Sequence, residues 1–102
     1  KYQGASVAPI SAQIGAQHLM LGELEPSRHA YIHALRLEPR PEILVNLGKV
    51  RYMQGVRKRA ITLFGQAVLL DPRMIQEVPL DIRAAVSNAL RSEDYSNGPD
   101  ED

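Results

Sequence analysis

The stretch IGAQHLMLGELEPSRHAYIHALRLEP (residues 14–39) aligns without a gap to LGKVRYMQGVRKRAITLFGQAVLLDP (residues 47–72), 33 positions further along the chain. Six of the 26 aligned positions are identical, whereas unrelated sequences of average composition would share roughly two. Conservative pairs, such as Tyr31 with Phe64, lie between the identities. The chain therefore contains an internal repeat. A repeat of this length buries its apolar face by stacking on a neighbour, which favours function at a surface over a catalytic pocket.

The residues that the two copies share predict two antiparallel helices in each copy. Gly22 and Gly55 lie where a first helix would end, at a position that needs a positive φ angle. Pro39 and Pro72 follow the second helix, which cannot continue through them. Small residues recur where the two helices must approach closely, and in the second copy these are Gly48, Ala60 and Ala67.

The pattern of the copies resembles the tetratricopeptide repeat, with its large, Leu-Gly, aromatic, small, aromatic and proline positions, and it lacks the Thr-Pro-Leu-His opening of an ankyrin repeat. The second copy matches at Leu44, Leu47-Gly48, Gly55, Ala60, Phe64, Ala67 and Pro72. The first matches at Ile14-Gly15, Gly22, Ser27, Tyr31, Ala34 and Pro39. Both copies are degenerate, because Ser11 and Leu44 stand at the usual Trp position, and His18 and Arg51 at the usual Tyr position.

The resemblance implies an all-α fold, a right-handed α-solenoid of antiparallel helix pairs with about five helices. We expect these helices at about 9–21, 25–38, 41–54, 57–70 and 79–91. The last one has no glycine at the repeat offset, but its apolar residues keep helical spacing, which is typical of a capping helix.

The domain boundaries follow from this assignment. We expect repeats at 8–40 and 41–73 and the capping helix at 79–91, all within one domain at 9–92. Residues 1–8 would form a linker or the end of a preceding helix. Residues 93–102 (EDYSNGPDED) are polar, acidic and interrupted by Gly-Pro, so we predict a disordered tail there.

The formal net charge is zero, but the charges are unevenly distributed. Residues 93–102 carry five acids and no base, so residues 1–92 carry twelve bases against seven acids, a net of +5. Arg57, Lys58 and Arg59 cluster at a predicted turn, where they could contact an acidic partner, a phosphate or the chain's own tail. A nucleic-acid site usually needs a broader patch with aromatic platforms, so we interpret the cluster as a solvated turn and expect no nucleic-acid partner.

Catalytic and metal-binding patterns are weak. His29 and His33 have the i, i+4 spacing of two metal ligands, but Ala-Tyr-Ile lies between them in place of the metalloprotease Glu, and the chain has no cysteine. No Gly-rich phosphate loop or Ser nucleophile elbow occurs. We therefore expect no enzyme activity, no cofactor and no metal. No apolar run approaches 18 residues, so we expect no membrane partner.

The resemblance places the first helix of each repeat along a concave groove. Its implied peptide-binding residues are Leu19, Met20, Val45, Asn46, Lys49, Tyr52 and Met53, next to Ala12, Gln13 and Ala16. The two methionines would form an adaptable apolar strip, with Asn46 bonding a peptide backbone and Lys49 meeting an acid. The alternative is that the capping helix or a missing neighbour covers the strip.

We therefore expect a non-enzymatic scaffold that binds a peptide or helix of a partner protein in this groove. Two alternatives remain open. The chain could be a structural module that forms a homo-oligomer through its open N-terminal edge or its apolar strip, or a regulatory appendage of a larger enzyme.

Overall fold

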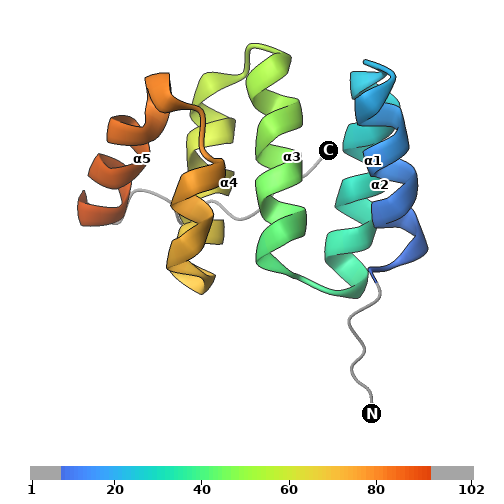
Figure 1. Ribbon diagram of the computed structural model, residues 1–102, viewed down its shortest axis with the longest axis horizontal. Helices are drawn as coiled ribbons and strands as arrows, with labels where there is room; N and C mark the ends of the chain where they lie inside the picture. Colours follow the sequence, from blue (N-terminus) through green and yellow to red (C-terminus); the bar gives the residue numbers. More distant parts are fainter. Residues whose placement is uncertain (1–7, 93–102) are drawn as a thin grey trace.

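The computed structural model describes residues 8–92, and within this range the protein is all-helical. The predicted tail at 93–102, and all but the last residue of the predicted linker at 1–8, lie outside the described residues. The helices are α1 (Ile10–Met20), α2 (Leu24–Leu37), α3 (Pro41–Met53), α4 (Arg57–Leu70), the short 3₁₀ helix η1 (Pro72–Glu77) and α5 (Leu80–Ser92) (Figure 1). The five predicted helices are confirmed to within one or two residues at each end.

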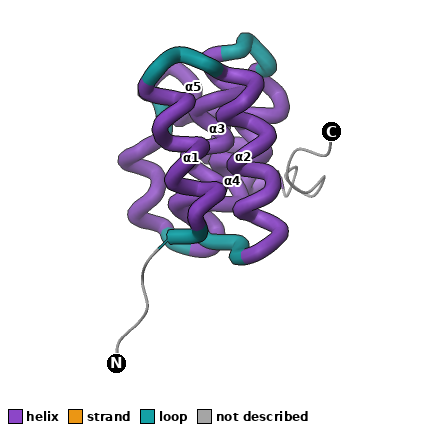
Figure 2. Tube along the Cα trace, turned by 90° about the vertical axis from the view of Figure 1, so that its right-hand side faces the viewer, coloured by secondary structure: helices purple, strands orange, loops and turns teal. Residues whose placement is uncertain are grey.

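The helices pack in the order of the chain. The pairs α1–α2 and α3–α4 each form a hairpin, α2 packs on α3, and α4 packs on α5. Figure 2, turned by 90° from Figure 1, places α1 and α2 side by side nearest the viewer, with the second pair and α5 behind them. Within residues 8–92, the second pair therefore has neighbours on both sides, whereas the α1–α2 pair has a neighbour on one side only.

The turn after the first helix of each pair has the same backbone structure. Gly22 and Gly55 have φ angles of 76° and 82°, in the left-handed region that favours glycine. In both turns the glycine N–H donates to a carbonyl three residues earlier, and the next N–H donates to a carbonyl five residues earlier, at 2.9–3.0 Å. These bonds form a Schellman motif. The predicted positive φ angles are thus confirmed, and the two copies share the same hydrogen bonds in this turn.

Within each pair, a glycine of the first helix faces an aromatic ring of the second. A Cβ atom added at Gly48 would lie 2.9 Å from Phe64 Cε1, and one added at Gly15 would lie 3.1 Å from the Tyr31 ring. Both rings are buried. The two helices can therefore approach closely only because these positions lack a side chain.

The first pair adds a polar contact at the same interface. The Ser27 hydroxyl is fully buried and donates to the Gly15 carbonyl at 2.8 Å. Its counterpart in the second pair is Ala60, which is also fully buried. Position 27 or 60 thus lies at the close contact in each hairpin, as the sequence predicts.

One element was missed by the sequence analysis, the helix η1 between α4 and α5. Its start is capped by Asp71, whose carboxylate accepts from the Arg73 N–H at 3.1 Å and from the Arg73 guanidinium at 2.8 Å. Pro72 occupies the first turn, where its missing N–H costs nothing. Buried Val78 then anchors the chain in the core before α5 begins. The side chains of Ile82 and Val86 bring α5 onto this core.

The contact at Ala60 gives a stability prediction. Ala60→Leu should overpack the α3–α4 interface and reduce the free energy of unfolding by about 1–3 kcal/mol. The matched control is Ala84→Leu on the exposed surface of α5, which should change it little. Chemical denaturation of both variants measures the difference, and equal stability of the two would contradict the hairpin geometry described above.

Candidate functional site

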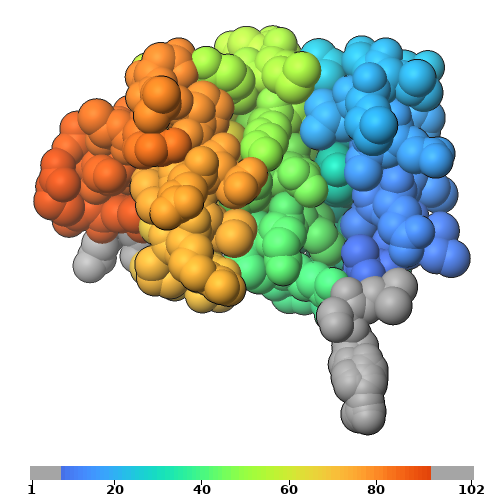
Figure 3. Space-filling view, in the orientation of Figure 1, coloured from blue at the N-terminus to red at the C-terminus, as the bar shows by residue number. Residues whose placement is uncertain are grey.

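A pocket of about 270 Å³ lies between α1 and α3, on the side where the first helices of the two pairs meet. Figure 3 shows this region as the seam between the blue α1 and the green α3. From α1, the pocket is lined by three of the predicted groove residues, Ala12, Gln13 and Ala16; α3 contributes Asn46. The remaining lining residues are Ala8, Tyr31, Arg40, Glu42 and Ile43.

The polar side chains among the lining residues are those of Gln13, Tyr31, Arg40, Glu42 and Asn46. Gln13 Nε2 donates to the Ala8 carbonyl at 3.0 Å. At the rim, the Arg40 side chain donates to Glu38 at 2.8 Å. Asn46 is half-buried, and its amide has no hydrogen-bond partner within residues 8–92. A side-chain amide offers both donors and an acceptor, so Asn46 can pair with a peptide backbone in this pocket.

The other predicted groove residues are not all brought to this pocket. Leu19 is half-buried and packs on the core, while Met20 and Met53 are exposed. None of these three lines the pocket. Val45 is buried in the hydrophobic core, where it offers little surface to a partner. It is buried because helices cover α3 on both sides.

Lys49 and Tyr52 make contacts with the C-terminal part of the chain. Lys49 Nζ donates to Glu77 Oε1 at 2.9 Å, and this ion pair lowers the pKa of Glu77. The Tyr52 hydroxyl donates to Asp81 Oδ1 at 2.7 Å, and this hydrogen bond raises the pKa of Tyr52. Glu77 of η1 and Asp81 of α5 thus pair with Lys49 and Tyr52 of the predicted groove. This arrangement resembles the alternative in which the capping helix covers the strip.

The basic cluster lies at the start of α4. Arg57 and Lys58 are exposed and line a second pocket of about 490 Å³ between α4 and α5, whereas Arg59 is half-buried and lies outside that lining. The sequence predicts the position of the cluster but not the pocket, because the position of α5 relative to α4 depends on η1.

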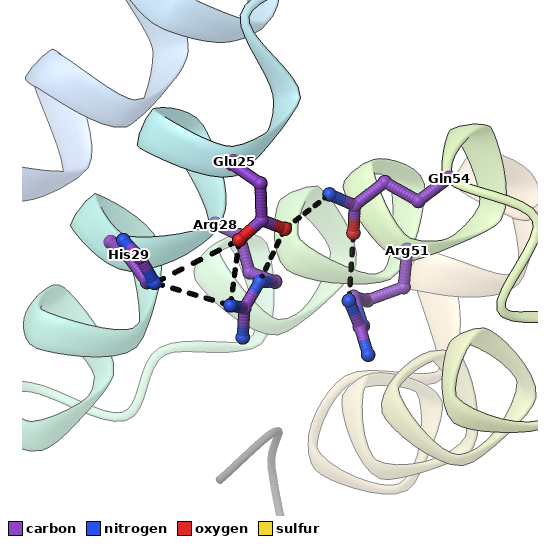
Figure 4. A network of polar contacts seen from close by, with 5 residues as sticks. All are labelled: Glu25, Arg28, His29, Arg51 and Gln54. Atoms are coloured by element: carbon purple, nitrogen blue, oxygen red, sulfur yellow. Dashed lines mark hydrogen bonds and ion pairs between the residues drawn. The ribbon is translucent and has the colours of Figure 1, made fainter. Parts of the chain in front are cut away.

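His29 belongs to a polar network that joins the two helix pairs (Figure 4). At its centre, the Arg28 guanidinium makes two hydrogen bonds to the Glu25 carboxylate, at 2.8 and 2.9 Å. Gln54 Nε2 also donates to Glu25, at 2.6 Å, and Arg51 donates to Gln54 at 2.8 Å. His29 Nε2 lies 3.9 Å from Glu25 Oε1. The network therefore links the first turn of α2 to the end of α3.

The sequence alone does not predict this network. Its one sequence signal is the i, i+3 spacing of opposite charges at Glu25 and Arg28. The Arg28 side chain is only 5% exposed, which a charged residue tolerates when it is fully paired. Gln54 is brought to Glu25 by the packing of α2 on α3, which no local pattern encodes.

The histidine pair gives no metal centre in this part of the chain. Within residues 8–92, no three His, Cys, Asp or Glu side chains come close enough together to hold a metal ion. The same residues include no helix with the length and apolar character needed to span a membrane.

Comparison of the chain with protein-family models, with curated proteins and with solved structures found no match.

The network predicts a pH-dependent stability. Hydrogen bonds from Arg28 and then Gln54 lower the pKa of Glu25 from its ordinary value of 4.5 to about 2. Because the folded-state pKa is the lower one, the stabilisation is complete above the unfolded value of 4.5 and is lost as the pH falls towards 2. Glu25→Gln should therefore lower the melting temperature at pH 7, by less at pH 3, and hardly at all at pH 2.

Melting curves of the wild type and Glu25→Gln across this pH range measure the effect. Glu42→Gln, at another exposed glutamate, controls for the loss of one carboxylate. A difference between wild type and Glu25→Gln that stays constant from pH 7 to pH 2 would show that the ionised Glu25 does not stabilise the fold.

Proposed function

We propose that the chain is a non-enzymatic protein-interaction module of the tetratricopeptide type, a right-handed solenoid of two helix pairs with a capping helix. It binds an extended peptide segment of a partner protein in the groove between α1 and α3. The proposal is supported by the repeat pattern of the sequence and by the equivalent turns and glycine–aromatic contacts in the two pairs.

The main support for this binding site is the pocket between α1 and α3. Four residues predicted from the sequence to line a groove, Ala12, Gln13, Ala16 and Asn46, line this pocket. Its volume of about 270 Å³ is just below the range of roughly 300–1,000 Å³ that is typical of small-molecule sites. A single peptide side chain suits such a pocket better than a cofactor does.

The lining also indicates how a peptide would bind. The alanines of α1 leave room for an apolar side chain of the peptide, and the Asn46 amide beside them can bond its backbone. Because Lys49 and Tyr52 are held by Glu77 and Asp81, the peptide would contact the part of the groove near Ala12 and Ala16. This assignment moves the site from the methionine strip towards the start of α3.

Selection of peptides from a random library on the immobilised protein tests this proposal. Selected peptides should bind the wild type, and Ala16→Leu, which fills the pocket, should abolish their binding. Asn46→Ala should weaken binding about tenfold, the equivalent of roughly 1.4 kcal/mol for a lost pair of hydrogen bonds. Ala84→Leu on α5 is the control with the same substitution. Peptides whose affinity for all three variants equals that for the wild type would exclude this groove as their site.

A second candidate function is self-association through α1. Ile10 and Ile14 are 73% and 45% exposed, whereas their counterparts in the second repeat, Ile43 and Leu47, are 3% and 0% exposed. The counterparts are buried because α3 packs on the preceding pair, and α1 has no such neighbour within residues 8–92. Residues 10–20 of α1 include no Asp, Glu, Lys or Arg, and His18 in the last turn is paired with Glu23, so little like-charge repulsion opposes the contact of two copies.

Sedimentation over a concentration series tests the second candidate. If the α1 face pairs with a second copy, Ile10→Glu should shift the protein to monomer, because it places a charge in an apolar contact. Met53→Glu, on the exposed end of α3, should leave the dimer intact. The opposite result, dissociation by Met53→Glu alone, would assign self-association to the methionine strip. A wild type that stays monomeric at every concentration would rule out this function.

A further inference from the structure

The pocket between α4 and α5 combines a positive rim with an apolar floor. Arg57 and Lys58 line it from the first turn of α4, and both are exposed. Its apolar floor consists of Ile61, Ala85 and Ala89. Thr62, Asn88 and Ser92 complete the lining, and no acidic side chain is among the lining residues. A site of this composition suits a segment with acidic groups for the rim and an aromatic or aliphatic side chain for the floor.

We infer that this pocket binds the chain's own C-terminal segment, residues 93–102 (EDYSNGPDED). The segment has the complementary chemistry, because it holds five acids, no base and one aromatic residue, Tyr95. It also starts at the right place. Ser92, the last residue of α5, is itself a lining residue of the pocket, so the segment begins at the pocket's edge.

The reach of the chain fits this arrangement. Three extended residues span roughly 10 Å, so Glu93 and Asp94 come within range of the rim and Tyr95 within range of the floor. The acids at 100–102 can add long-range attraction to Arg57 and Lys58. The covalent link keeps the segment at a millimolar effective concentration around the pocket, which favours this occupant over a free acidic peptide.

The chemistry of the docking is electrostatic attraction together with burial of one aromatic ring. Its strength should therefore fall with ionic strength, since exposed charges are screened beyond about 8 Å at physiological salt. The composition of residues 93–102 predicts a disordered segment. Docking would therefore order it only while Arg57 and Lys58 are free to bind its acids. This inference does not depend on the groove between α1 and α3.

Paramagnetic NMR on the full chain tests the inference. The protein has no cysteine, so Ser96→Cys provides a single attachment point for a nitroxide. At low salt, the label should broaden the amide signals of Ile61 and Thr62 on α4 at least twofold more than those of Ala12 and Asn46 in the other pocket. Arg57→Glu/Lys58→Glu should remove this difference, as should 0.5 M NaCl.

The control variant Arg36→Glu/Arg40→Glu changes the net charge by the same amount at positions outside this pocket and away from η1, and it should leave the broadening in place. Circular dichroism establishes that both variants keep their helices. Absence of broadening on α4 in the wild type, or equal broadening in both double variants, overturns the inference. A further sample mixes nitroxide-labelled molecules with unlabelled, isotope-enriched molecules. Broadening of the α4 signals of the enriched molecules would show that the segment docks on a second copy, and this result overturns docking within one chain.

Discussion

In each helix pair a glycine of the first helix faces an aromatic ring of the second, Gly15 against Tyr31 and Gly48 against Phe64. These contacts fix how closely the two helices approach. The glycines lie at a site where a side chain would collide with a buried ring, and the same turn geometry closes both hairpins. Two hairpins of equal shape can then stack through α2 and α3, and the polar network centred on Glu25 and Arg28 adds a specific contact at that junction.

The surface of the molecule follows from this stacking. Where the first helices of the two pairs meet, alanines leave a pocket of about 270 Å³ beside Asn46. At the other end of the row, η1 and α5 take the place of a further helix pair and hold Lys49 and Tyr52 through Glu77 and Asp81. The two ends of the row therefore differ, because α5 covers the second pair whereas Ile10 and Ile14 of α1 are exposed. The candidate peptide site and the candidate self-association face are consequently separate surfaces.

The sequence predicts the helices and the turns well because their signals are local. Gly22 and Gly55 mark the positive φ angles, and the offset of 33 residues transfers each assignment from one copy to the other. It predicts the groove less well, because the exposure of a side chain depends on which helices cover its face. The repeat pattern places Val45 at the surface, whereas the packing of α3 between its neighbours puts Val45 in the core. The missed features, η1 and the bond from Gln54 to Glu25, both depend on contacts between elements. No pattern within a single helix reports such contacts.

The two equivalent hairpins are stable because they stack, and hydrogen exchange of the backbone amides in the native protein measures this dependence. We expect the amides of Leu47 and Val50 in α3, which has neighbours on both sides, to exchange most slowly and only through global unfolding. The amides of α1 and α5, at the ends of the row, should exchange faster through local opening. If instead the α1–α2 pair and the α3–α4 pair exchange as two blocks with unrelated stabilities, the hairpins do not stabilise one another by stacking.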